Sequence, residues 1–130
     1  MVLSDDYRRV MGKFSTGVVV ISSLDIDGHI RGMTANSVTS VSLNPPLVLV
    51  CIGHERNTFR NVRERCRFGI NILNDQQEAI ALYYSRDDKD KVGGVSVPWQ
   101  RKVGGSPRLE ESLAFLECRL VAQYDISDHA

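Results

Sequence analysis

Hydrophobic residues near the start of the chain follow the spacing of a helix. Between Leu3 and Phe14 they recur every three or four positions, so one side of this segment is apolar. Ser4 is a candidate cap, and Asp5 and Asp6 would occupy the first turn, where negative charge is favourable. The pattern predicts a short amphipathic helix.

The pattern then changes to short β-branched and aliphatic runs separated by turn signals. Residues 17–21 (GVVVI) and 47–52 (LVLVCI) predict strands. The turn sequence DIDG at 25–28 predicts a hairpin whose second strand covers residues 29–33. A double proline precedes residue 47, and because proline cannot donate a backbone hydrogen bond, we expect it at the start or edge of a strand.

The second half of the chain mixes helices with strands. Asn57 is a candidate cap for a helix that reaches about residue 65, and residues 75–84 predict another helix. Residues 68–73 and the long apolar run at 113–124 predict strands. Because strands dominate and hairpin-length links join the early ones, we predict a mostly β protein: an antiparallel barrel with peripheral helices.

Composition places this pattern in a single balanced domain. The 130 residues include 16 basic and 16 acidic side chains, so no strong attraction to nucleic acid or an anionic membrane is expected. No apolar run approaches the roughly 20 residues of a membrane helix. The first ten residues are too charged for a signal peptide. We therefore expect a cytoplasmic protein.

The sequence shows few marks of metal or thiol chemistry. Cys51, Cys66 and Cys118 are widely spaced and odd in number, so we expect small buried side chains and no disulfide framework. Cys51 and His54 alone are a weak metal signal, and no metal is expected. The dinucleotide fingerprint, the phosphate loop and the nucleophile elbow are absent. An enzyme of this sequence would need an organic cofactor.

Several segments, in order and with compatible spacing, resemble the flavin reductase-like, FMN-binding split-barrel family. The first is a polar stretch between two apolar runs, at residues 32–52. The matching segments are GMTANSVTSVSLNPPLVLVCI (32–52), Asn57-Thr58, FGINILNDQQ (68–77), YYSRDDKDKVGGVSVPW (83–99), LAFLECRL (113–120) and DISDH (125–129). The resemblance covers the chain from about Phe14 to its last residue. It implies an antiparallel split β-barrel with peripheral helices, and one flavin reductase-like FMN-binding domain over residues 1–130.

A flavin needs donors along the pyrimidine edge of its ring and hydroxyls, amides and a cation at its phosphate. Four consecutive residues could serve the ring edge: Thr34, Ala35, Asn36 and Ser37. Six could serve the phosphate: Ser40, Ser42, Thr58, Ser85, Arg86 and Lys91. A polar turn or bulge that satisfies its own backbone would explain the first group equally well.

The resemblance implies roles for these residues and for three more. Cys51 and Ile52 would contact the flavin through backbone atoms, and His129 would lie near its reactive face, where the nicotinamide docks. Histidine is suited to hydrogen-bond the nicotinamide amide or to move a proton near neutral pH. His129 is therefore the candidate catalytic residue, with a surface histidine as the alternative.

The chain departs from the family pattern at three points. Val92 stands where the family usually has Phe, and Ser127 stands where Gly usually precedes the Asp-His pair. Family members continue past that pair with about one or two more strands, so we expect this chain to lack the C-terminal strand or strands. Retention of the flavin would then depend on a barrel with an open edge.

The resemblance implies an NAD(P)H-dependent flavin reductase that transfers hydride to flavin N5 and supplies reduced flavin to a separate monooxygenase. The cofactor would be FMN or FAD, with NADH or NADPH as co-substrate. A flavin-binding electron-transfer module without nicotinamide oxidase activity is the alternative, as is a barrel that binds no flavin. We also expect a homodimer, because a small barrel struggles to bury the apolar run at 113–124 alone.

Overall fold

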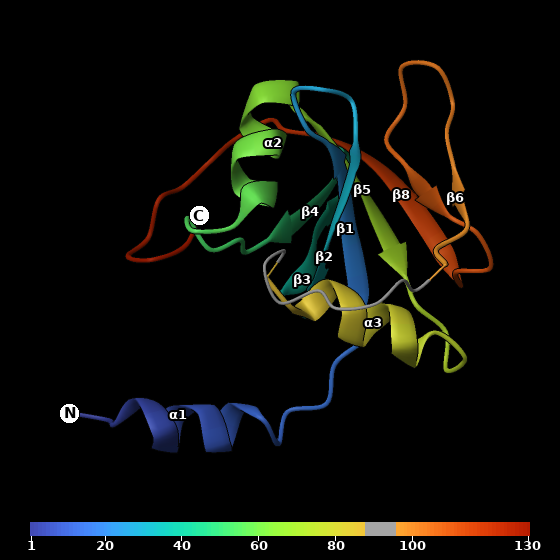
Figure 1. Ribbon diagram of the computed structural model, residues 1–130. Helices are drawn as coiled ribbons and strands as arrows, with labels where there is room; N and C mark the ends of the chain where they lie inside the picture. Colours follow the sequence, from blue (N-terminus) through green and yellow to red (C-terminus); the bar gives the residue numbers. More distant parts are fainter. Residues whose placement is uncertain (88–95) are drawn as a thin grey trace.

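A central antiparallel sheet organises the molecule. The computed structural model describes residues 1–87 and 96–130. Its helices are α1 (Ser4–Met11), α2 (Asn57–Arg65) and α3 (Glu78–Ser85). Its strands are β1 (Val19–Leu24), β2 (Ile30–Ala35), β3 (Val38–Leu43), β4 (Pro46–Val50), β5 (Arg67–Ile72), β6 (Trp99–Gln100), β7 (Arg108–Leu109) and β8 (Ala114–Arg119). Figure 1 shows β1 and β5 in the middle of this arrangement.

The central sheet has the strand order β2-β1-β5-β8, and each neighbouring pair is antiparallel. β1 pairs with β2 along its whole length, from Val19 opposite Ala35 to Leu24 opposite Ile30. β3 pairs with β4, and β6 with β7, in two separate two-stranded sheets. β1 therefore has a paired neighbour on each side, β2 on one and β5 on the other.

Apolar side chains from alternate positions of the central strands form the core on one face of the sheet. Ile21 and Ile70 are fully buried, and Phe68 is nearly so. Helix α2 covers this face, with Val62 pointing inward. The buried cluster consists of Val19, Ile21, Met33, Ile52, Val62, Phe68 and Ile70. Its burial is the main force that holds α2 on the sheet.

Helix α3 lies against β2 at a glycine. A Cβ atom on Gly32 would come within 2.8 Å of the Tyr84 ring, so only glycine permits this approach. Tyr84 is buried, and its ring packs edge-on against Trp99 with centroids 5.9 Å apart. The small residue in β2 thus sets the position of α3.

The opposite face of the sheet holds a buried amide. Asn71 in β5 is fully buried, and its Nδ2 donates to the Val20 carbonyl oxygen and to Ser22 Oγ, each at 3.0 Å. Its Oδ1 accepts the Leu109 backbone N–H at 2.7 Å. One side chain thus joins β1, β5 and β7, which are distant in sequence.

The structure confirms a mostly β, antiparallel fold with few helices, but the strands of residues 1–87 and 96–130 form no closed sheet. The strand expected at 113–124 ends at Arg119, and Val121 and Tyr124 beyond it are exposed. Within the polar segment, residues 38–43 form a strand because they pair with β4. These differences arise because pairing with a neighbour, rather than apolar composition, decides where a strand ends.

The helix starts and the cysteines also differ from expectation. Ser4 and Asn57 lie inside their helices, and neither helix start has a side-chain cap. All three cysteines are free, but Cys51 and Cys66 are exposed rather than buried. Only Cys118 is partly buried, and burial, followed by the charge of Glu117, raises the pKa of its thiol to about 11. Its thiol therefore stays protonated at neutral pH.

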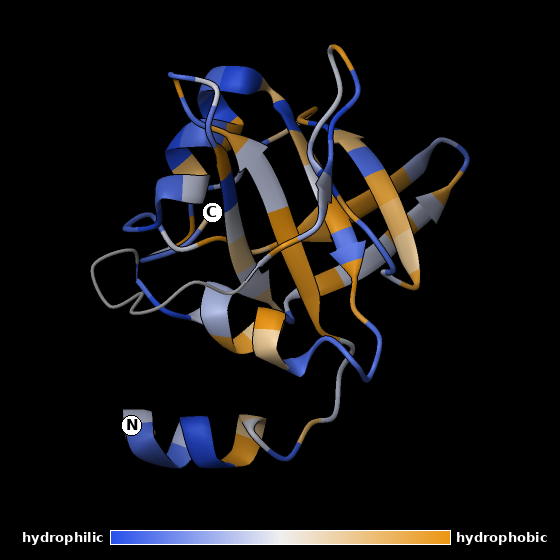
Figure 2. Cartoon of the chain, turned by 45° about the vertical axis from the view of Figure 1, so that its right-hand side comes forward, coloured by the Kyte–Doolittle hydropathy of each residue, from blue (hydrophilic) through white to orange (hydrophobic). Residues whose placement is uncertain are grey.

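Helix α1 lies apart from the sheet in both views (Figures 1 and 2). None of its residues is buried, and Tyr7, Val10 and Phe14 expose most of their apolar surface. Figure 2 shows the end of α1 in orange, the colour of hydrophobic residues. No helix among the described residues is long and apolar enough to cross a membrane.

Replacing Asn71 with Ala should lower the free energy of unfolding by about 3 kcal/mol, because buried groups on β1 and β7 would lose their partner. Urea denaturation followed by circular dichroism measures this change. Gln100→Ala removes an exposed amide on β6 and serves as the control. A loss of stability no larger than that of the control would contradict the proposed role of Asn71.

Candidate functional site

Three segments of the chain meet beyond the ends of β2 and β4. Ser37, in the link between β2 and β3, pairs with Cys51 just after β4. The Cys51 N–H donates to the Ser37 carbonyl oxygen at 3.2 Å, and Ser37 Oγ donates to the Cys51 carbonyl oxygen at 2.9 Å. These two hydrogen bonds hold the link against the end of β4.

The last residues of the chain join the same region through backbone pairing. Ile52 and Ala130 exchange hydrogen bonds, at 2.8 and 2.9 Å, and the His54 N–H donates to the Asp128 carbonyl oxygen at 3.0 Å. His129 consequently lies opposite Gly53. We call Ser37, Cys51, Ile52, Asp128 and His129 the strand-end site.

A tight turn presents His129 in this site. Ile126 and His129 exchange backbone hydrogen bonds at 2.8 and 3.1 Å, and Ser127 between them has a left-handed φ of 56°. This φ explains why the family usually has glycine at the position of Ser127. The chain reaches the same conformation with serine, at some cost in strain.

Asp128 contacts the His129 ring directly. His129 Nδ1 lies 2.7 Å from Asp128 Oδ1, and the histidine side chain is half exposed. Adjacent residues of a regular strand point to opposite faces, but Asp128 lies in a turn, so its carboxylate can reach the ring of His129. A carboxylate beside Nδ1 favours a proton on that nitrogen, which leaves Nε2 as an acceptor in the neutral ring.

The same contact changes the acidity of Asp128. The hydrogen bond from His129, followed by the charge of that ring, lowers the pKa of the Asp128 carboxyl below its usual value. His54 contributes a smaller effect in the same direction. Asp128 therefore remains a carboxylate and a hydrogen-bond acceptor at neutral pH.

His54 is a second histidine of this region that the sequence motifs did not single out. Its ring packs on Phe59 with centroids 4.8 Å apart, and its Nε2 lies 3.4 Å from Asp125 Oδ1. His54 Nε2 is buried and has no hydrogen-bond partner among the described residues. The only sequence signal was its position three residues after Cys51, at the end of a strand.

The residues expected at the flavin ring lie at or near this site. Ala35 ends β2 and is half-buried. Thr34 Oγ1 donates to the Ala81 carbonyl oxygen in α3 at 2.6 Å. Asn36 is exposed, and its amide has no hydrogen bond with any residue that the structure describes. The Asn36 amide, which makes no such bond, is therefore close in sequence to the hydroxyls of Thr34 and Ser37, which both donate hydrogen bonds within the protein.

The residues expected at the phosphate are more scattered. Ser40 and Ser42 lie on β3, about 10 and 16 Å along the strand from Ser37. Ser40 is exposed, whereas Ser42 Oγ donates to the Pro45 carbonyl oxygen within the hairpin. Thr58 is buried in the first turn of α2.

The other phosphate-side candidates follow α3. Ser85 and Arg86 are exposed at its end, and Ser85 Oγ donates to the Leu82 carbonyl oxygen at 2.6 Å. Lys91 and Val92 lie outside the described residues. An ion pair of 2.7 Å between Arg56 and Asp87 ties the segment after α3 to the start of α2. Asp87, the residue after Arg86, is therefore held beside α2.

The donor set of this region fits the polar edge of a flavin ring. The Asn36 amide offers both a donor and an acceptor, as that edge requires. The hydroxyls of Thr34 and Ser37 already donate hydrogen bonds to backbone carbonyl oxygens of the protein. Toward a ligand, each can therefore act only as a hydrogen-bond acceptor. Donors must then come from Asn36 and from backbone N–H groups of the link.

A group of three possible metal ligands lies elsewhere, at the β1–β2 turn. Asp25, Asp27 and His29 place ligand atoms within 4.8 Å of one another. However, Asp25 already accepts hydrogen bonds from Arg31 Nε and from the Asp27 and His29 N–H groups. Burial alone would raise the pKa of Asp25, but these hydrogen bonds and charges outweigh burial and lower the pKa. The carboxylate thus closes the turn.

Sequence comparison relates the chain to known proteins. A model of the flavin reductase-like domain matches residues 11–130. An NADH-dependent flavin reductase from Rhodococcus is 37% identical over 126 residues, which cover 94% of this chain and 68% of that protein. The monooxygenase reductase subunit HsaB of Mycobacterium tuberculosis is 32% identical, over 95% of this chain and 64% of that protein. The chain thus spans about two thirds of these relatives.

Solved structures agree with these matches. The flavin reductase PheA2 superimposes with a TM-score of 0.88 at 33% identity, over 98% of this chain and 80% of that one. The Streptomyces globisporus NADH:FAD oxidoreductase SgcE6, in complex with NAD and FAD fragments, gives a TM-score of 0.84 at 36% identity. That match covers 96% of this chain and 74% of the other.

Proposed function

The chain belongs to the flavin reductase-like family, and we propose that it is an NAD(P)H:flavin oxidoreductase domain that transfers hydride from NADH or NADPH to FMN or FAD. The observation that carries this proposal is the strand-end site. There the link that contains the exposed Asn36 and the turn that contains His129, whose ring contacts the Asp128 carboxylate, are both hydrogen-bonded to the chain just after β4. Relatives named for NADH-dependent flavin reduction support the choice of substrates.

The chain's own residues would bind and orient the reactants. A bound flavin supplies the ring that accepts the hydride. Asn36 would hydrogen-bond the polar edge of that ring, with Thr34 and Ser37 as acceptors and with Ala35, Cys51 and Ile52 contributing backbone groups. His129 Nε2 would accept a hydrogen bond from the nicotinamide carboxamide, or carry a proton when the ring is charged.

The phosphate would be held on the other side of the site. We assign this role to Arg86 and Lys91 as cations and to Ser40, Ser42 and Ser85 as polar groups. Thr58 is buried, so its contribution would come through the backbone of the first turn of α2. The distance along β3 from Ser37 to Ser42 matches an extended ligand rather than a ring alone.

We place the described strands in an antiparallel split barrel, with residues 1–130 as a single FMN-binding domain. A separate monooxygenase would receive the reduced flavin, as the name of the HsaB relative indicates for that protein. The alternative is an electron-transfer module without nicotinamide oxidase activity. One measurement distinguishes the two functions: the consumption of NADH in the presence of added FMN.

Wild-type protein should bind FMN and oxidise NADH, and His129→Ala should slow flavin reduction by about 10–10³-fold with flavin affinity nearly intact. Stopped-flow absorbance and a flavin titration measure the two effects. His29→Ala removes another exposed histidine, at the β1–β2 turn, and is the control. Flavin binding without NADH oxidation by the wild type would favour the electron-transfer module, and an unaltered rate in His129→Ala would make that residue a bystander.

Asn36→Leu should weaken flavin binding by about 10–100-fold, because polar groups at the ring edge would be left unpaired at a cost of about 1–3 kcal/mol. Stability should change little, since the Asn36 amide makes no hydrogen bond with any described residue. Fluorescence titration with FMN and a thermal melt measure the two quantities. Full flavin affinity in the folded variant would leave Asn36 as a turn residue only.

We also propose a homodimer, because the β3–β4 hairpin exposes Val41, Leu43 and Leu49. Sedimentation velocity at micromolar concentration should show a dimer, and Leu43→Asp should shift it toward monomer. Val103→Asp changes an equally exposed residue in the β6–β7 link and is the control. A monodisperse wild-type monomer would exclude the dimer.

A further inference from the structure

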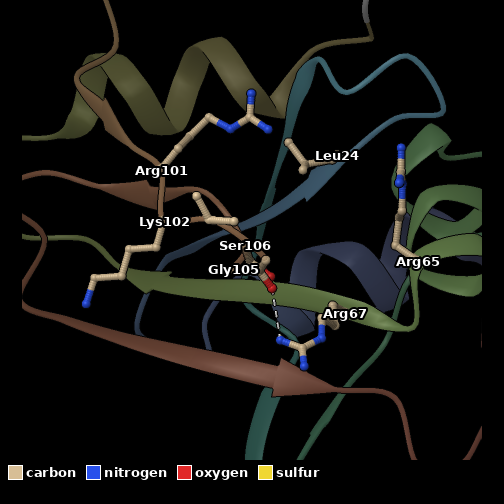
Figure 3. A pocket seen from close by; sticks show the side chains of 9 residues that line it. Leu24, Arg65, Arg67, Arg101, Lys102, Gly105 and Ser106 are labelled. Carbon is tan, nitrogen blue, oxygen red and sulfur yellow. Dashed lines mark hydrogen bonds between the residues drawn. The ribbon is translucent and has the colours of Figure 1, made fainter.

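A basic hollow of about 670 Å³ lies at the opposite end of β1 from the strand-end site. Its walls come from the end of β1, the junction of α2 with β5, and the link between β6 and β7. Its charged lining residues are Arg65, Arg67, Arg101 and Lys102. Figure 3 shows Arg65, Arg67 and Arg101 around the hollow, with Leu24 between them and Lys102 extending to the other side.

We propose that this hollow binds a small phosphorylated molecule with at least two phosphate groups, of the class of inorganic pyrophosphate or a nucleoside diphosphate. The proposal is independent of the flavin site. Along β1, Leu24 lies about 16 Å from Val19, whose partner in β2 is Ala35. Arg65 likewise ends α2, roughly 10 Å from Thr58 in its first turn.

The arginine side chains are held in place without being neutralised. Arg65 Nη2 donates to the carbonyl oxygens of Asp25 and Ile26, at 2.6 and 3.1 Å. Arg67 Nη1 donates to the Gly104 carbonyl oxygen at 3.1 Å, and Arg101 Nη1 to that of Gly28 at 3.4 Å. Each guanidinium has five N–H donors, so most remain available to a ligand.

No carboxylate of the described residues forms an ion pair with these four cations. Two carboxylates of neighbouring residues make other contacts. Glu117 accepts hydrogen bonds from the Ser106 N–H at 3.0 Å and from Ser106 Oγ at 2.7 Å, and Asp25 is bound by Arg31. In a chain with zero net charge, this hollow therefore gathers four cations that no ion pair neutralises.

The shape of the hollow favours a compact polyanion over a protein partner. Basic side chains from three separate segments line a concave surface, and planar guanidinium groups bind phosphate oxygens in pairs. Gly104 and Gly105 let a ligand approach the backbone of the link, since neither carries a Cβ. Leu24 and Val103 add an apolar wall against which an organic part could lie.

Isothermal titration of the full chain with pyrophosphate and with ADP, first without FMN and then with saturating FMN, tests the proposal. We expect saturable binding that weakens with salt, and about tenfold weaker binding in Arg65→Gln and in Arg101→Gln. Arg65→Lys, which keeps the charge, should recover part of the affinity. Arg60→Gln removes an exposed arginine from the same helix and should change the affinity less than twofold.

Several results would overturn the assignment. These are no binding of either probe at millimolar concentration, an equal loss in Arg60→Gln, or displacement of the probe by FMN, which would place it in the flavin site. Binding of a poly-glutamate peptide in place of both probes would also overturn it. Because NADH oxidation is measured separately, failure of this site is distinguishable from failure of the proposed reductase activity.

Discussion

The buried amide of Asn71 is the constraint on which the rest of the structure depends. It forms hydrogen bonds with the Val20 carbonyl oxygen and the Ser22 hydroxyl of β1 and with the Leu109 N–H of β7. These buried groups thus find their partners within the protein. Because the Leu109 N–H and Asn71 Oδ1 are both buried, any other placement of β7 would leave them unpaired. The amide therefore fixes β7 against the outer face of the sheet.

This fixed sheet gives the two ends of β1 different tasks. At the Val19 end, the link after β2 meets the chain after β4 and the C-terminal turn, and backbone pairing together with the Ser37 hydroxyl sets their positions. At the Leu24 end, the link that Asn71 helps to anchor brings Arg101 to face Arg65 and Arg67. Both regions consist of loops, yet each is positioned by the same rigid strands.

The sequence predicted what short-range patterns encode. The β1–β2 hairpin was expected from its turn residues, and α2 and β5 from their apolar spacing, and all three form close to the expected positions. Pairing partners are long-range, so the early end of β8 and the absence of a closed sheet could not be predicted. The turn that brings Asp128 to the His129 ring depends on a left-handed φ at Ser127, and its only sign in the sequence was the resemblance to a family pattern with glycine at that position. The basic hollow was equally hidden, because its arginines are separated by up to 36 positions in the chain.

Within the strand-end site, His129 has little side-chain packing around it. His129 is exposed on one side and is held by two backbone pairings and one carboxylate, rather than by a hydrophobic pocket. Its ring orientation is therefore set by Asp128, while its distance from Cys51 and Ile52 is set by the pairing of Ala130 with Ile52. The orientation of the ring and the position of the segment that carries it are therefore set by different contacts.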